Sequence, residues 1–106
     1  MGLNRKEYTL FLTPGDAVDV KLFIRRNEVV KFSLNYRAEI KGRWHQVYRV
    51  DSYHGFLHEM RYWLSPRPIK LPYMEQYPLS FVFRHFMIEM RLRFRNYRSL
   101  YEETDG

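Results

Sequence analysis

The spacing of apolar residues changes once along this chain, and that change constrains the fold more than any other feature. From residue 6 to residue 51, apolar and polar side chains alternate with a period of two, which is typical of strands with one buried face. The segment 29–40 is the clearest example, because every second side chain from Val30 to Ile40 is apolar or aromatic. From Leu79 onward, apolar residues recur at helical spacing instead. Strands followed by one helix predict an α+β fold.

Turn residues divide the alternating half into successive strands. Pro14-Gly15, Asn27-Glu28 and Lys41-Gly42 stand between the alternating segments, and such short connections join antiparallel neighbours. We expect strands at 6–12, 17–26, 29–40, 43–51 and 57–64. In the fourth of these we expect Trp44 and Tyr48 to face the core. The pattern predicts a four- to five-stranded antiparallel meander with one wet face.

The rest of the chain predicts one long C-terminal helix packed on one face of that sheet. Four of the five prolines lie between residues 65 and 78, which we interpret as an extended crossing loop. The helix is expected from about 78 to 100, because proline suits the first helical position and a broad apolar stripe follows. We expect a disordered tail at 102–106. With 106 residues, the chain is interpreted as a single domain, 1–106.

The composition excludes several classes of function. There is no cysteine, which rules out disulfides, thiolate zinc sites and cysteine nucleophiles. No apolar run approaches the ~20 residues that a membrane helix needs, and the first residues lack the apolar core of a signal peptide. We therefore expect a cytoplasmic protein without a membrane partner. The net charge of +6, with 13 arginines against 5 lysines, favours RNA or an acidic protein as partner.

The segment 48–63 gathers the groups best suited to exchanging protons or holding an anion. Asp51 ends a predicted strand, His54 and His58 lie four residues apart, and Arg61 follows three residues later. A ribonuclease that uses no metal needs a base, an acid and a cation for the phosphate, and imidazole titrates near neutral pH. The candidate catalytic residues are therefore Asp51, His54, His58 and Arg61, with Asp51 orienting an imidazole. The alternative is that the histidines bond loop backbone and have a structural role.

A metal site at the two histidines is a further alternative. Residues four apart on a helix share a face, so His54 and His58 could bind one ion there. Gly55, however, argues against a helix through this segment, and no glutamate follows the first histidine. The candidates for a third ligand are Asp51, Glu59 and His45. Since none of them completes a known spacing, we expect no metal and no cofactor.

Two rows of cations are candidate nucleic-acid surfaces. Arg37 and Arg49 are expected to point outward from the predicted sheet, where they would bind phosphates without specifying sequence. On the predicted helix, four arginines fall within a narrow arc at 100° per residue, namely Arg84, Arg91, Arg95 and Arg98. Phe81, Ile88 and Leu92 form an apolar patch beside this row, which suggests a homodimer or another partner. The alternative for both rows is an ordinary solvated face.

The order of motifs also resembles a known group of proteins. It consists of Tyr36-Arg37 in a strand, the turn Lys41-Gly42, Trp44 in the next strand, Arg49-x-Asp51, His54-Gly55-x-x-His58 and a C-terminal helix. This order resembles small prokaryotic proteins with a D-x-x-H-G-x-x-H centre. More distantly, it is similar to the TumE-like toxins of toxin–antitoxin operons. The resemblance implies a small α+β domain that acts on RNA and is neutralised by an antitoxin-like partner.

Two functions follow as hypotheses, beside the metal-dependent site at His54 and His58. The first is an RNA-directed, toxin-like protein that acts as a metal-independent ribonuclease. The second is a noncatalytic module that binds nucleic acid or protein through a basic sheet face and the row of helix arginines. Whether the chain is an enzyme therefore depends on how the segment 48–63 folds.

Overall fold

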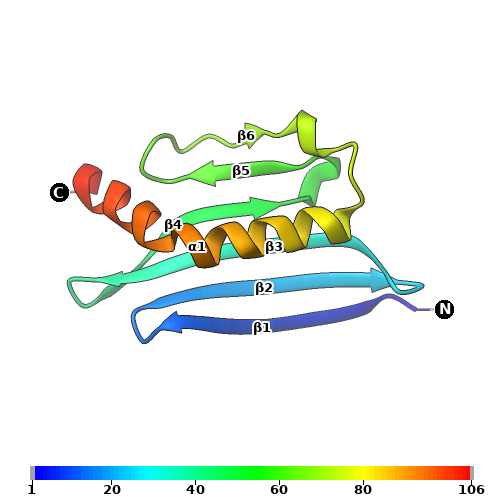
Figure 1. Ribbon diagram of the computed structural model, residues 1–106, viewed down its shortest axis with the longest axis horizontal. Helices are drawn as coiled ribbons and strands as arrows, with labels where there is room; N and C mark the ends of the chain where they lie inside the picture. Colours follow the sequence, from blue (N-terminus) through cyan, green and yellow to red (C-terminus); the bar gives the residue numbers. More distant parts are fainter. Residues whose placement is uncertain (1, 106) are drawn as a thin grey trace.

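The computed structural model describes residues 2–105, apart from the side chains of His54 and Asp105. Its strands are β1 (Asn4–Thr13), β2 (Asp16–Arg25), β3 (Glu28–Ile40), β4 (Arg43–Asp51), β5 (His58–Arg61) and β6 (Ile69–Lys70). Two 3₁₀ segments, η1 (Tyr53–Gly55) and η2 (Pro72–Met74), precede the long helix α1 (Leu79–Asp105). Figure 1 shows the strands following one another across a single sheet, with α1 lying over it.

The sheet is an antiparallel meander. The strands lie in chain order from β1 to β6, and each pairs antiparallel with its neighbours. Short hairpins between the first four strands impose this order, since a two-residue turn can only return the chain antiparallel to itself. The predicted α+β fold is confirmed, with six strands where we expected four or five.

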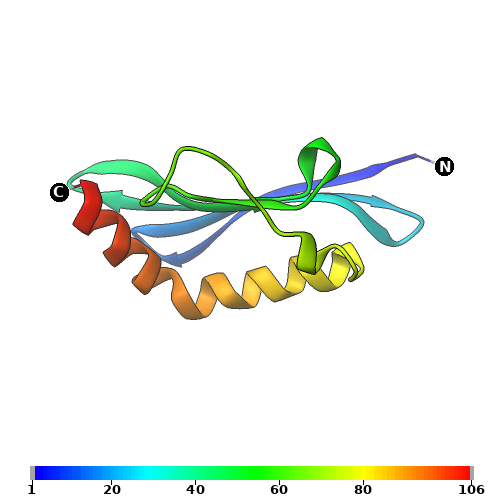
Figure 2. The same cartoon turned by 90° about the horizontal axis from the view of Figure 1, so that it is seen from above.

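The long helix covers one face of the sheet, as the sequence predicted. Figure 2 shows α1 on one side of the strands only, so the molecule has a covered face and an open face. Val82 and Met90 of α1 are fully buried against the sheet. Phe94 meets Tyr36 of β3 edge to face, with 6.1 Å between the ring centroids. The apolar stripe of α1 is therefore core, which removes its aromatic residues from the candidates for a ligand site.

A β-bulge in β3 overturns the predicted orientation of Val30. Ile24 of β2 pairs with Val29, whereas Phe23 pairs with Lys31, so Val30 is an extra residue. One extra residue shifts the alternation by one position. Val29 consequently packs against the core, and Val30 is exposed.

A second bulge overturns the predicted inward orientation of Trp44. Neighbouring residues of β3 pair with Gln46 and Tyr48, so Val47 is extra in β4 and is fully buried. Tyr48 and Val50 face the core as predicted, but the residues before Val47 have the opposite orientation. Trp44 therefore lies on the open face, and 41% of its surface is exposed.

The proline-rich segment contains a strand that we did not expect. Ile69 and Lys70 pair with Glu59 and His58 of β5, and the Leu71 N–H donates to the Leu57 carbonyl at 3.0 Å. Prolines on both sides confine β6 to two residues at the edge of the sheet, because proline cannot donate to a ladder. The crossing segment 65–78 is thus partly built into the sheet, while β5 is shorter than the predicted strand 57–64.

The helix also continues beyond its predicted end. We expected it to end at about residue 100 and the tail to be disordered, but residues 102–105 are helical. Arg98 Nε lies 3.5 Å from Glu102 Oε1 one turn later, and the Tyr101 ring packs against His45 with 5.5 Å between centroids. These contacts give the last turns partners that periodicity alone does not reveal. Within residues 2–105, no helix is long and apolar enough to cross a membrane.

Candidate functional site

The centre of the predicted site is Asp51, at the end of β4. Asp51 pairs with His58 across the β4–β5 ladder, and both side chains are buried. One carboxylate oxygen, Oδ1, lies 3.2 Å from His58 Nε2 and accepts the Tyr53 N–H at 3.0 Å. The other, Oδ2, accepts a hydrogen bond from Arg49 Nε at 2.6 Å. Each oxygen is therefore engaged, and charged partners make these hydrogen bonds strong.

The imidazole of His58 is held inside the end of the sheet. Its side chain is 9% exposed, and its second nitrogen, Nδ1, lies 3.4 Å from the Phe56 carbonyl oxygen. The Phe56 ring packs on it, with 5.4 Å between centroids. With a carboxylate at one nitrogen and a backbone carbonyl at the other, the ring is fixed in orientation.

The structure does not bring Arg61 to this centre. Residues three apart in a strand point to opposite faces, so Arg61 lies on the covered face while His58 lies toward the open face. Arg61 Nε is 2.8 Å from Glu59 Oε1, and the Tyr48 hydroxyl donates to Glu59 Oε2 at 2.5 Å. Burial and the Glu59 carboxylate raise the pKa of Tyr48 well above its ordinary range. Arg61, whose side chain is 46% exposed, therefore belongs to a separate network with the buried Glu59 and Tyr48.

The second predicted histidine lies in the turn that follows β4. The backbone of His54 is in η1, next to Gly55 at φ = 80°, a left-handed conformation that favours glycine. The His54 side chain lies outside the described residues, so its predicted role stays a prediction. Among the side chains that are described, no three His, Asp or Glu side chains lie close enough together to hold a metal ion.

The open face carries exposed aromatic rings that are paired with cations. We call the first group the Trp44 cluster, which consists of Phe11, Arg37 and Trp44. The two rings meet edge to face with 6.4 Å between centroids, and the Arg37 guanidinium lies 4.6 Å from the Trp44 centroid. Phe11 is 58% exposed, so an aromatic surface faces solvent here.

A second group lies near the other end of the same face. We call it the Tyr53 cluster, which consists of Arg5, Phe23, Lys31 and Tyr53. The two rings are 6.2 Å apart, and Lys31 Nζ lies 4.2 Å from the Tyr53 centroid. The Arg5 guanidinium lies over Phe23 at 5.6 Å. Both ends of the open face thus combine aromatic and cationic side chains.

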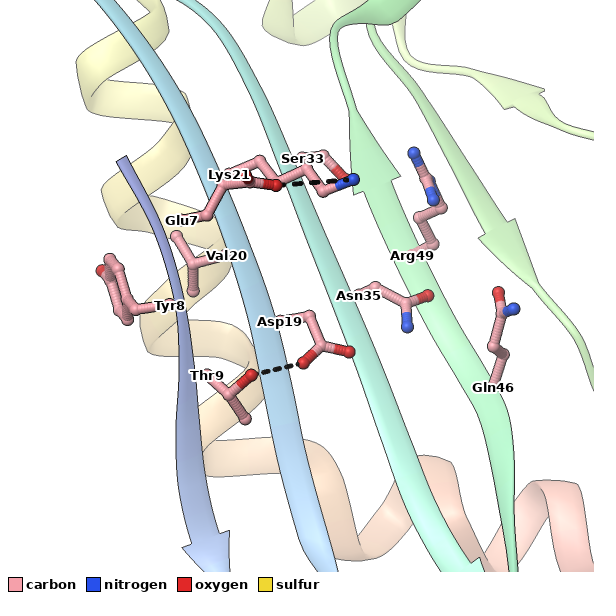
Figure 3. A pocket seen from close by; sticks show the side chains of 10 residues that line it. All are labelled: Glu7, Tyr8, Thr9, Asp19, Val20, Lys21, Ser33, Asn35, Gln46 and Arg49. Carbon is pink, nitrogen blue, oxygen red and sulfur yellow. Dashed lines mark hydrogen bonds and ion pairs between the residues drawn. The ribbon is translucent and has the colours of Figure 1, made fainter. Parts of the chain in front are cut away.

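Between the two clusters the open face is hollowed and polar. The hollow has a volume of about 490 Å³ and is lined by residues of β1 to β4 (Figure 3). Its polar lining residues are Glu7, Thr9, Asp19, Lys21, Ser33, Asn35, Gln46 and Arg49. Among the described residues, the buried acceptor Asn35 Oδ1 has no hydrogen-bond partner. An unpaired buried acceptor is costly, so the amide of Asn35 is a destabilising feature of this floor.

Ion pairs reduce the positive charge that we expected on the open face. Arg37 Nε lies 2.8 Å from Asp19 Oδ2, and Arg49 is bound to Asp51. Lys21 Nζ lies 3.8 Å from Glu7, as Figure 3 also shows. Neighbouring carboxylates therefore orient these cations. The open face is characterised by its combination of aromatic rings and polar groups and not by an excess of positive charge.

The predicted row of helix arginines divides into three exposed residues and one anchored residue. Arg98 donates to Asp16 Oδ1 at 3.1 Å and to the Glu39 carbonyl at 2.6 Å, which fastens α1 to the sheet. Burial alone would raise the pKa of Asp16, but hydrogen bonds from Thr13, Tyr36 and Arg98 outweigh it and lower that pKa. The exposed members are Arg84, Arg91 and Arg95, which form no ion pair within the part of the chain that the structure describes.

Sequence reasoning gave no functional role to Phe11, Phe23 or Trp44 on the open face. Phe11 and Phe23 occupy positions where the alternation predicts a polar residue. That exception could have indicated an aromatic surface on the open face. Trp44 carried no such signal, because the bulge at Val47 reverses its orientation.

Comparisons with known proteins give one match. A family described as a domain of unknown function, DUF7718, matches residues 3–106. No curated protein and no solved structure matches the chain. The similarity to TumE-like toxins therefore stays a prediction.

Proposed function

The chain belongs to the DUF7718 family, and we propose that it binds single-stranded RNA across the open face of its sheet without cleaving it. The observation that carries this proposal is the pair of aromatic–cation clusters on either side of a polar hollow. Proteins that bind unpaired nucleic acid combine rings on which bases stack with cations that follow the backbone.

The dimensions of the face suit a short single strand. Ala17 pairs with Phe11 of the Trp44 cluster, and Phe23 of the Tyr53 cluster lies six residues further along β2. At ~3.3 Å per residue this spacing is about 20 Å. The smallest single-stranded sites of OB folds hold about four nucleotides. One base at each cluster, with the sugar–phosphate backbone across the hollow between them, fits this arrangement.

The arrangement of the predicted catalytic residues favours binding over cleavage. A metal-independent ribonuclease needs its acid, its base and its phosphate-binding cation to converge on one substrate. Arg61 lies on the covered face with Glu59, and both oxygens of Asp51 are engaged. Cleavage by Asp51, His54, His58 and Arg61 therefore stays a prediction, which the same experiment tests.

Binding is measured by fluorescence anisotropy with a labelled oligouridine of about 12 nucleotides. We expect Phe11→Ala with Trp44→Ala to weaken binding about tenfold or more, because each stacked base contributes about 1–3 kcal/mol. Tyr73→Ala is the matched control, because Tyr73 is 63% exposed but belongs to neither cluster. Equal affinities for the wild type and the double variant would refute the proposal, as would an equal loss in the control.

A gel of the same reaction separates binding from catalysis. We expect the oligouridine to remain intact in the presence of wild-type protein. If it is cleaved, and if His58→Asn abolishes cleavage without changing the urea unfolding midpoint, the ribonuclease hypothesis holds instead. The specific support for that second candidate is the 3.2 Å contact between His58 Nε2 and Asp51 Oδ1.

A further inference from the structure

The solvent-facing side of α1 has the composition of an interface. Phe81, Ile88 and Leu92 point away from the sheet and are 47%, 52% and 75% exposed. Their spacings of seven and four residues place them on one side of the helix. Single exposed apolar residues are ordinary, but three that are large and aligned on one helix face indicate a binding surface.

A groove beside this helix face extends the apolar surface. It lies where α1 meets β2 and β3 and has a volume of about 290 Å³. Its lining residues are Leu22, Val29, Ser80, Phe83, Arg84, Met87, Ile88 and Arg91. Ligand pockets usually begin at about 300 Å³, so the groove suits apolar side chains of a partner better than a whole small molecule.

Arginines without a carboxylate partner lie beside this surface: Arg84 and Arg91 line the groove, and Arg95, whose guanidinium lies 4.5 Å from the Phe94 centroid, borders the apolar row. Arg84, Arg91 and Arg95 are exposed and form no ion pair with any described residue. The nearby carboxylate of Glu89 is already bound to Arg93, with 2.6 Å between Oε2 and Nε. The surface therefore carries positive charge that no described carboxylate neutralises.

We propose that this face of α1 binds an acidic amphipathic helix of a partner protein. Apolar side chains of the partner would enter the groove and cover Ile88 and Leu92, and its carboxylates would pair with Arg84, Arg91 and Arg95. An amphipathic helix in an apolar groove is a recurring mode of peptide recognition, and complementary charge selects the partner. The site lies on the helix side of the molecule, away from the open face proposed for RNA (Figure 2).

The same observations disfavour the other occupants of this face. A phosphate backbone would satisfy the arginines but leave Leu92 and Ile88 exposed to water. A second copy joined by two-fold symmetry would place the three arginines of each chain against those of the other. Only an occupant that is both apolar and acidic complements both features.

The test is a selection of random 16-residue peptides displayed on phage, using the immobilised wild-type chain. Peptides are first depleted on the variant Arg84→Glu with Arg91→Glu. We expect the enriched sequences to be rich in Asp and Glu and to carry apolar residues at helical spacing. Enrichment of neutral or basic sequences would overturn the proposal, as would no enrichment over the starting library.

Isothermal titration calorimetry with the most enriched peptide then locates the site. We expect binding to weaken at least about tenfold in the double arginine variant and also in Ile88→Ser with Leu92→Ser. The control Arg43→Glu with Arg67→Glu makes the same change of charge at exposed residues outside the groove. An equal loss in this control would mean that net charge alone drives binding. Circular dichroism and the urea unfolding midpoint check that every variant is folded.

Two further outcomes identify a different occupant. If the double arginine variant abolishes binding of the oligouridine, this face binds nucleic acid and the proposal is wrong. If sedimentation shows a dimer that Ile88→Ser with Leu92→Ser dissociates, the occupant is a second copy. The aromatic variants of the open face should bind the peptide normally, so failure of one proposal is distinguishable from failure of the other.

Discussion

The buried carboxylates of Asp16 and Asp51 differ in how far along the chain their partners lie. Asp16 faces α1 and accepts hydrogen bonds from Tyr36, 20 residues away, and from Arg98, 82 residues away. Asp51 lies toward the open face, and the partners found for it lie within seven residues of it. The first carboxylate therefore joins the end of the helix to the first hairpin, whereas the second shapes one turn. Because the partners found for Asp51 are local, we expect its replacement to destabilise the fold less than replacement of Asp16. Stability therefore constrains Asp51 less, which leaves it available for binding or catalysis.

The largest effect is expected from Asp16→Ala. This change leaves the Tyr36 hydroxyl and the Arg98 guanidinium without their buried acceptor, and breaking such a pair from one side is strongly destabilising. We expect the free energy of unfolding, measured with urea, to fall by about 3 kcal/mol. Asp19→Ala is the control, since Asp19 is half-buried and its pair with Arg37 should contribute under about 1 kcal/mol. Equal losses would remove the distinction between buried and half-exposed carboxylates.

A smaller loss, about 2 kcal/mol, is expected from Asp51→Ala in the same urea experiment. The carboxylate of Asp51 is buried, so His58 and the Tyr53 N–H lose their acceptor. Arg49 is partly exposed and can turn to water. If the loss exceeds that of Asp16→Ala, the sequence separation between a buried carboxylate and its partners does not determine how much it stabilises the fold.

A gain in stability on replacing Asp51 would instead indicate that this residue has a functional role. Residues kept for catalysis or binding often lower stability, so their replacement raises it. A variant Asp51→Ala that is more stable than the wild type would indicate that the centre is retained for activity. The ribonuclease hypothesis would then deserve priority over a structural role.

Much of the fold could be predicted because period-two alternation and turn residues act locally. The hairpin order and the strand 43–51 followed from these signals alone. The bulges at Val30 and Val47 could not be predicted in this way, because an extra residue is visible only in the pairing with the neighbouring strand. The same limit applies to β6, whose two residues become a strand only because β5 lies beside them.

The candidate site was predictable in its parts but not in its assembly. The proximity of Asp51 and His58 followed from a strand end and a returning strand. The separation of Arg61 was also within reach, since three residues is an odd spacing in a strand. The role of Arg98 could not be predicted from the sequence. Its position on the helix matched the row of exposed arginines, whereas its partner Asp16 is 82 residues away.

The smallest effect concerns the pH dependence of the Asp16 centre. The folded-state pKa of Asp16 is lowered, so the ionised group stabilises the fold above its unfolded pKa of about 3.9. That stabilisation is lost as the pH falls through the lowered folded pKa. We therefore expect wild type and Asp16→Asn to differ in unfolding free energy by a constant amount between about pH 5 and 7, and the difference to shrink as the pH falls from the unfolded pKa through the lowered folded pKa. Urea unfolding at these pH values measures the difference. A gap that stays constant down to the lowest pH would mean that Asp16 stabilises the fold through its shape and hydrogen bonds and not through its charge.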